Sequence, residues 1–182
     1  MAHLKLENNY ISPITQEIFD KTKKAFGFVP NMYKTMGANP ALLDAYIYSY
    51  NSFRANAGFN ATEQEVVFLT AAYENNCEYC VAAHSTLADM AKVPTEITDA
   101  IRNGAEIADP KLKQLSKLTR SLSLNRGIVP QEEVDAFLAL GYTEQHVLGI
   151  LAGIAVKLIS NYSNHSTNPE LEAPFTARAW KK

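Results

Sequence analysis

The chain has 182 residues, of which 47% are hydrophobic and 20% are charged, and its formal net charge is -2. A chain of this length can bury a hydrophobic core as one domain without disulfide bonds. The small negative charge gives no electrostatic basis for binding nucleic acid or an anionic membrane. We therefore expect a globular protein that has neither of these partners.

No segment is predicted to cross a membrane or to direct secretion. The most apolar run, residues 147–159, is interrupted by Gly149, Gly153 and Lys157 and is shorter than the roughly 20 residues that a bilayer requires. It is better explained as a buried helix. Residues 1–7 lack the basic and apolar regions of a signal peptide. We expect a cytoplasmic protein, whose thiols are kept reduced.

The pattern along the chain predicts one helix after another. Ser12-Pro13 is typical of a helix start and Gly27 of a helix end, and no alternating strand pattern is present. We therefore expect an all-α protein of one domain. In chain order, the predicted helices cover residues 13–26, 30–36, 40–57, 61–74, 78–91, 94–103, 110–126, 130–140 and 144–164, before a tail that is irregular or a short helix.

The two cysteines, Cys77 and Cys80, are three residues apart. In a reducing compartment, this spacing favours a catalytic or metal-binding pair over a structural bridge. Cys80 and His84 are four residues apart, so on a helix they face the same way. Cys77 falls at or just before the first turn, where the positive end of the helix favours a thiolate.

Glu65 is the carboxylate that we expect to meet His84. Asn75-Asn76 is typical of a turn between two antiparallel helices, and it leaves Glu65 and His84 about 12–15 Å from the turn, at similar depth. Glu65 precedes an apolar run, so we expect it to be partly buried, with a raised pKa that suits proton transfer near neutral pH.

A structural role for Glu65 is an open alternative. Thr62 and Glu65 have the spacing of a capping box, in which the glutamate bonds only the start of the helix. Asn60 and Glu63 have the same spacing and would leave Glu65 free. The residues alone do not decide between these two boxes.

These residues together predict a thiol peroxidase. His84, assisted by Glu65, would take the proton of Cys80, and the thiolate would attack the O–O bond and become a sulfenic acid. Cys77 would condense with it to a disulfide, which an external dithiol would reduce. Cys80 is thus the predicted attacking residue and Cys77 the resolving residue.

The pattern Glu-x11-Cys-x-x-Cys-x3-His at residues 65–84 resembles the signature of the alkylhydroperoxidase AhpD-like, carboxymuconolactone decarboxylase superfamily. Residues 28–31, 39–43 and 164–165 resemble its peroxidase-related subgroup, so the likeness extends over most of the chain. It implies catalytic roles for Glu65, Cys77, Cys80 and His84, without metal, haem or flavin. It also implies an AhpD-like fold around a central antiparallel helix pair, with an extension at about 1–58, a core at 59–165 and a tail at 166–182.

The resemblance further implies a homo-oligomer that acts on hydroperoxides and is reduced by an external dithiol or a thioredoxin-like protein. One position differs from the pattern. The best-known peroxidase of the family has a histidine directly before its second cysteine, where this chain has Tyr79. A phenol, with a pKa near 10, is a poorer proton shuttle. The decarboxylase branch lacks the paired cysteines, which disfavours decarboxylation here.

Other interpretations of the cysteine pair stay open. The thiols could be ordinary buried side chains, or two ligands of a zinc site completed by His84 and by His146 or His165. His165 could instead line the active site. A general dithiol–disulfide oxidoreductase would use the same cysteines without peroxide, and a lyase of the decarboxylase type would not need them.

Overall fold

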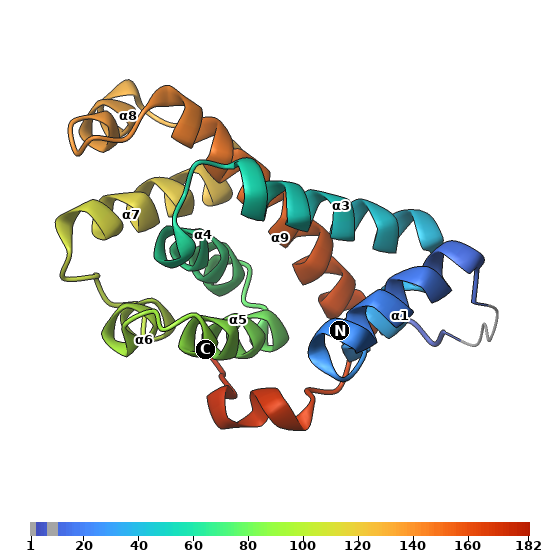
Figure 1. Ribbon diagram of the computed structural model, residues 1–182. Helices are drawn as coiled ribbons and strands as arrows, with labels where there is room; N and C mark the ends of the chain where they lie inside the picture. Colours follow the sequence, from blue (N-terminus) through green and yellow to red (C-terminus); the bar gives the residue numbers. More distant parts are fainter. Residues whose placement is uncertain (1–2, 7–10) are drawn as a thin grey trace.

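The computed structural model describes residues 3–6 and 11–182, and within these ranges it contains helices and no strand. This confirms the predicted all-α class. The prediction that residues 1–7 contain no leader sequence rests partly on residues outside the described ranges. Figure 1 shows the helices arranged as one domain, with α1 at one side and α7 and α8 at the other.

The helix boundaries follow the predicted ones closely because most are set by local caps. The Ser12 side chain accepts a hydrogen bond from the Thr15 amide at the start of α1, and Gly27 ends that helix with a φ of 82°. The elements are α1 (Pro13–Phe26), α2 (Asn31–Met36), α3 (Pro40–Asn56), α4 (Ala61–Glu74), α5 (Glu78–Met90), α6 (Thr95–Arg102), α7 (Pro110–Leu124), α8 (Gln131–Leu138), α9 (Glu144–Thr167) and the 3-10 helix η1 (Ala173–Arg178).

Helix α4 forms the centre of the core. It packs against α5, α6, α7 and α9, and Figure 1 shows it almost end-on among them. Its residues are buried on every side from Glu63 to Ala72, as expected for a helix that is surrounded by others. Helix α5 follows after a short turn, so the predicted antiparallel pair lies inside the fold.

Helix α9 is a core helix, although it is long and apolar enough to span a membrane by composition. It packs against α2, α3, α4, α5 and α7, which fits a soluble helical protein. Gly153 permits its close approach to two of these helices. A Cβ at this position would lie 2.6 Å from Val67 and 2.8 Å from Phe53, too close for any other residue without rearrangement.

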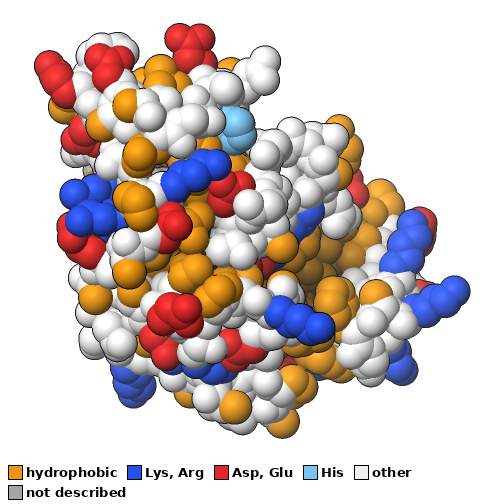
Figure 2. Space-filling view, turned by 60° about the vertical axis from the view of Figure 1, so that its left-hand side comes forward, with side chains coloured by type: hydrophobic (Ala, Val, Ile, Leu, Met, Phe, Trp, Pro, Cys, Tyr) orange, Lys and Arg blue, Asp and Glu red, His pale blue; other side chains and the backbone are white. Residues whose placement is uncertain are grey.

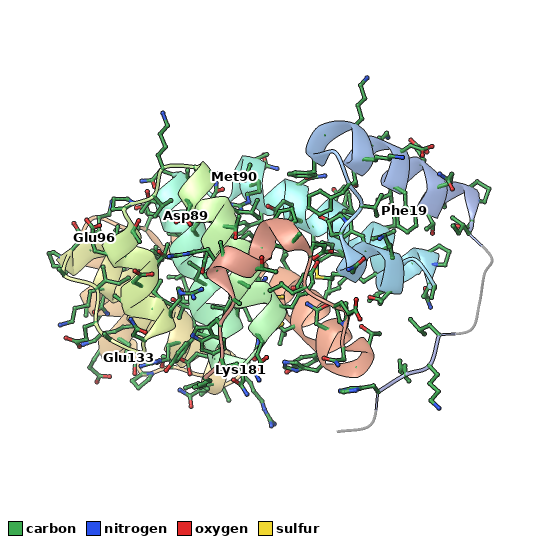
Figure 3. The ribbon with its side chains drawn as sticks, turned by 90° about the horizontal axis from the view of Figure 1, so that it is seen from below. Phe19, Asp89, Met90, Glu96, Glu133 and Lys181 are labelled. Atoms are coloured by element: carbon green, nitrogen blue, oxygen red, sulfur yellow. The ribbon has the colours of Figure 1, made fainter. Side chains whose placement is uncertain are left out.

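The C-terminal segment folds back across the outside of α5. The chain leaves α9 at Asn168, which has a φ of 46°, and η1 then packs against α5. The Trp180 indole donates to the carbonyl of Arg102, and Arg178 pairs with Asp99. Figure 3 shows this segment lying across the face of the molecule, with Lys181 labelled close to the end of the chain.

The surface is hollowed and carries apolar side chains in its hollows. Figure 2 shows hydrophobic side chains that line a hollow between the body of the molecule and a lobe with several basic side chains. A separate groove of about 560 Å³ lies between α3 and α9, with Tyr48 and Leu148 among its lining residues.

Candidate functional site

The turn between α4 and α5 sets the positions of the predicted site residues. Asn75 ends α4, and Asn76 has the left-handed φ of 55° that reverses the chain. Cys77 is then the N-cap residue of α5. The antiparallel course of the two helices brings Glu65 and His84 side by side, as the spacing predicts.

Glu65 is free of the helix cap. The capping box at the start of α4 joins Asn60 to Glu63, with both reciprocal hydrogen bonds present. Glu65 is only 2% exposed. Its Oε2 lies 2.9 Å from Nδ1 of His84, and its Oε1 lies 2.5 Å from Nη2 of Arg54.

Arg54 is a site residue that the sequence pattern did not reveal. It comes from α3, and besides Glu65 it donates to the Tyr50 hydroxyl at 2.9 Å and to the Gln64 side chain at 3.0 Å. Burial raises the pKa of Glu65, but the interactions with His84 and Arg54 outweigh it and lower the pKa. The predicted raised pKa is therefore wrong, because the interactions with His84, and then with the sequence-distant Arg54, stabilise the charged carboxylate.

His84 is neutral at physiological pH. Burial and the positive charge of Lys157 lower its pKa to about 4, against the opposing effect of Glu65. A neutral imidazole that faces a carboxylate donates its Nδ1–H to it, which leaves Nε2 as an acceptor. His84 also packs on Phe68, with ring centroids 4.9 Å apart.

The two thiols lie next to one another and share one amide. Nδ2 of Asn164 is 3.2 Å from the sulfur of Cys80 and 3.6 Å from that of Cys77. The two cysteines are free and buried. Among the residues that the structure describes, no hydrogen bond joins His84 to either sulfur. The site thus consists of a thiol pair at the start of α5 and a proton-holding pair formed by His84 of α5 and Glu65 of α4.

The surroundings of the thiols favour one thiolate, on Cys80. Burial raises the pKa of the Cys80 thiol, but hydrogen bonding from Cys77 and the charge of Lys157 outweigh it and lower the pKa to about 5. The same hydrogen bond, burial and the neighbouring anion raise the pKa of Cys77. The pair therefore resembles an attacking thiolate beside a protonated partner.

Helix α9 supplies a polar face that the sequence analysis missed. Lys157, Ser160, Asn161 and Asn164 are all buried and recur at spacings of three or four residues, which places them on one side of the helix. Asn161 accepts a hydrogen bond from Asn75 in the α4–α5 turn at 2.9 Å. The signal was present in the sequence as polar residues at helical spacing within an apolar run.

The comparisons with known proteins fit this geometry. Residues 40–121, which contain the whole Glu65–His84 segment, match the model of the carboxymuconolactone decarboxylase family. This segment of the chain is therefore similar to that family. No curated protein matches the chain.

Solved structures share the fold of this chain over nearly its whole length. A peroxidase-related protein of Ralstonia eutropha JMP134, described as an alkylhydroperoxidase AhpD core, has 20% identity and a TM-score of 0.82, with 100% of this chain and 97% of that chain covered. One from Silicibacter sp. TM1040 has 16% identity and a TM-score of 0.79, with 94% and 91% covered. The debrominase Bmp8 has 20% identity and a TM-score of 0.74, with 91% and 90% covered. The fold is therefore AhpD-like.

Tyr79 holds the C-terminal segment. It occupies the position at which the best-known peroxidase of the family has a histidine. Its hydroxyl lies 3.0 and 2.9 Å from the two carboxylate oxygens of Glu172. Glu172 also accepts a hydrogen bond from the Asn31 amide. Burial and the charge of Glu172 raise the pKa of Tyr79, so this phenol keeps its proton.

A pocket of about 640 Å³ reaches the thiol pair on the Cys77 side. It runs between the start of α5, the end of α9 and the C-terminal segment, and its walls include Tyr79, Asn164, His165 and Trp180. His165 thus lines this pocket. Cys80 is not among the residues that line this pocket.

The residues proposed for a zinc site are not brought together. His146 bonds the cap residue Thr143 at the far end of α9 and stacks near Phe59 and Tyr142. Over residues 3–6 and 11–182, no group of three or more histidine, cysteine or acidic side chains is placed to hold a metal ion.

Proposed function

We propose that this protein reduces hydroperoxides, with Cys80 as the attacking thiolate and Cys77 as the resolving thiol. One observation carries the proposal. A single amide, on Asn164, contacts both sulfurs, and the pKa of only one of them, Cys80, is lowered. Similarity to the carboxymuconolactone decarboxylase family and to peroxidase-related solved structures supports it.

In the first step, the Cys80 thiolate attacks the terminal oxygen of the hydroperoxide. The S–O bond forms as the O–O bond breaks, and an alkoxide leaves. A proton from solvent, equivalent to the one that Cys80 released on ionising, reaches this alkoxide, so that thiol and hydroperoxide become sulfenic acid and alcohol. His84 is the proton carrier that we propose, because its Nδ1–H is committed to Glu65 and its Nε2 can hold a proton in transit.

In the second step, the Cys77 thiol attacks the sulfur of the sulfenic acid. A disulfide forms and water leaves. An external dithiol that enters the pocket meets Cys77 first. Its thiolate attacks that sulfur and expels Cys80, which is the better leaving group because its pKa is the lower one. A second thiol of the reductant then completes the exchange and releases Cys77.

The test is consumption of an organic hydroperoxide by the reduced wild type and by Cys80→Ser and Cys77→Ser, with dithiol supplied. We expect turnover only in the wild type, and a sulfenic acid trapped by dimedone only in Cys77→Ser. Rapid reduction of insulin or glutathione disulfide without consumption of peroxide would instead favour the general dithiol–disulfide oxidoreductase. Lyase activity that survives both substitutions would favour the decarboxylase type.

We also propose that the protein forms a homo-oligomer through the outer face of α9. Leu148, Leu151, Leu158 and Tyr162 are exposed there and follow one another at helical spacing. Tyr48 of α3 is exposed across the adjoining groove. Contiguous apolar surface of this kind is typical of a contact between subunits.

A cytoplasmic location completes the proposal. The two thiols are free, and the cycle needs a compartment that keeps reducing the disulfide. Its test is the redox state of the pair after alkylation of intact cells, which should be mainly dithiol.

A further inference from the structure

Lys157 is a buried cation with no assigned role. It lies in the middle of α9, is 1% exposed, and its Nζ has no hydrogen-bond partner among the described residues. No ion pair within residues 3–6 and 11–182 includes it, whereas Arg54, the partly buried cation of the site, pairs with Glu65. A buried ammonium without a partner is costly, so its retention calls for an explanation.

The surroundings of Lys157 place its charge at the candidate site. Its Nζ lies 5.5 Å from the ring centroid of Phe68, and that ring is 4.9 Å from the ring of His84. Asn161 and Asn164 lie one and two turns farther along the same face of α9. Asn164 reaches the sulfur of Cys80.

The charged side chains of the site include one more cation than anion when both thiols are protonated. Arg54 is positive and Glu65 negative, and the two form an ion pair. His84 is neutral because its pKa is about 4. With both thiols protonated, Lys157 would be an uncompensated positive charge, whereas one thiolate would bring the site to neutrality.

We propose that Lys157 is the counter-ion of the Cys80 thiolate and that it keeps this thiol ionised before any substrate arrives. The assignment of Cys80 as nucleophile rests on the proposed function, but the charge pairing does not. Lys157 acts here through its charge on the sulfur, as a positioning residue for the reaction.

The amide groups beside Lys157 complete the site for the anion. The Oδ1 of Asn161 is occupied by Asn75, so its Nδ2, which is buried without a partner, is left to face inward. The Nδ2 of Asn164 already contacts Cys80. Ser160 and Asn161 both act on the thiol of Cys80 in the direction that lowers its pKa. A sulfur anion would satisfy donors that otherwise have no acceptor.

The other titratable groups around Lys157 do not supply an anion. On α4 the carboxylate of Glu65 is shared by Arg54 and His84. On α2 and α3, burial raises the pKa of Tyr33, Tyr46 and Tyr50, so these phenols stay neutral. On α5 the pKa of Cys77 is raised as well, which leaves Cys80.

The experiment measures the ionisation of Cys80 directly, in a Cys77→Ser background that leaves one thiol. The thiolate absorbs near 240 nm, so a pH titration of the reduced protein gives its midpoint without a reagent entering the core. We expect a midpoint well below that of an ordinary thiol in this background. We expect Lys157→Met to raise it by at least about one pH unit, and Lys157→Arg to keep it low.

Two controls separate charge from structure. Lys117→Met removes an exposed lysine on α7 that pairs with Glu106 and should leave the midpoint unchanged. Lys157→Met leaves no uncompensated buried charge, because Cys80 can take up a proton, so the variant should fold, as circular dichroism will show. An unchanged midpoint in folded Lys157→Met would overturn the proposal. Should that variant fail to fold, an ordinary thiol midpoint in Cys77→Ser with Lys157 intact would overturn it equally.

The titration needs no peroxide, so the two proposals can fail separately. A low midpoint that depends on Lys157, in a protein that consumes no hydroperoxide, would refute the peroxidase function and keep the counter-ion. Peroxide turnover with an ordinary thiol midpoint would do the reverse.

Discussion

Nδ1 of His84 lies 2.9 Å from Oε2 of Glu65, although the two residues belong to different helices and are 19 positions apart. The contact is buried, and Arg54 holds the second carboxylate oxygen. This arrangement fixes the tautomer of the imidazole and aims its free nitrogen away from Glu65. The rate of peroxide reduction should therefore fall when the negative charge of Glu65 is removed.

Glu65→Gln should slow peroxide reduction by about 100-fold, within the range for the loss of a proton-transfer group. It leaves the positive charge of Arg54 without its anion, so we also expect a loss of unfolding free energy of roughly 3 kcal/mol. Peroxide consumption and urea unfolding measure the two effects.

Glu63→Gln is the matched control, two residues earlier on the same helix. Glu63 serves the capping box and accepts from Tyr142, so its substitution should cost about 1 kcal/mol and leave the rate unchanged within twofold. Equal losses of activity in the two variants would mean that Glu65 acts only by holding the helix.

The unfolding free energy of the reduced protein should fall as the pH is lowered from 6.5 to 4. The pKa of His84 is about 4 in the folded protein against 6.5 for the free side chain, so in this window the unfolded chain binds more protons than the folded one. The expected loss is on the order of 3 kcal/mol. The lowered pKa of Glu65 acts in the same direction below pH 4.5.

Urea unfolding at a series of pH values checks this dependence. His84→Gln should reduce the slope between pH 6.5 and 4. It should not abolish the slope above pH 5, because the lowered pKa of Cys80, about 5, contributes in the same direction. His146→Gln, at the cap of α9, should leave the slope unchanged. A wild-type free energy that is constant over the window would contradict the buried, neutral imidazole.

The sequence predicted the helices well because their ends are local. Ser12-Pro13 and Asn60 with Glu63 carry their own capping partners within a few residues. The pairing of Glu65 with His84 was also accessible, because a short turn between antiparallel helices leaves little freedom in their register. The boundaries of the extension, core and tail remain predictions.

Contacts between site residues and side chains from helices distant in sequence could not be predicted. The predicted direction of the Glu65 pKa shift is wrong because His84 and Arg54 together outweigh the effect of burial. Arg54 lies on α3, and no local pattern links it to Glu65. In the sequence, Lys157 only interrupts an apolar run, since periodicity marks which face is buried but not which polar residue is buried with it. Glu172 lies in the tail, where nothing in the sequence specified its contact with Tyr79.

Asn164→Asp should raise the pKa of the Cys80 thiol. The change replaces the Nδ2 donor that lies 3.2 Å from the sulfur with an oxygen that repels an anion. We expect the thiolate midpoint in a Cys77→Ser background to rise by at least about one pH unit. Asn51→Asp, on the exposed side of α3, adds the same charge and should leave the midpoint in place, and a shift of equal size there would contradict a local role for Asn164.

Tyr79→Phe should loosen the C-terminal segment and spare the thiols. It removes the hydroxyl that binds Glu172, which should cost about 1 kcal/mol and speed proteolytic cleavage after residue 168. The thiolate midpoint should not move. Tyr162→Phe, at an exposed position of α9, should change neither quantity. Loss of the thiolate in Tyr79→Phe would mean that the phenol belongs to the proton relay after all.

Leu148→Asp should dissociate the proposed homo-oligomer. Leu148 is 66% exposed on the outer face of α9, where a charge would be buried in the contact between subunits. Light scattering after gel filtration should give a smaller mass than for the wild type. Leu124→Asp, 58% exposed on α7, is the control and should keep the wild-type mass. A monomeric wild type would refute this contact outright.

The buried ammonium of Lys157 also affects how readily a disulfide between Cys77 and Cys80 is reduced. Once Cys77 and Cys80 are joined, neither sulfur carries charge, and the lysine is left alone in an apolar interior. Reduction restores an anion beside it, so the fold itself prefers the dithiol. The disulfide should therefore be a strong oxidant, so that even a weakly reducing cellular thiol can reduce it.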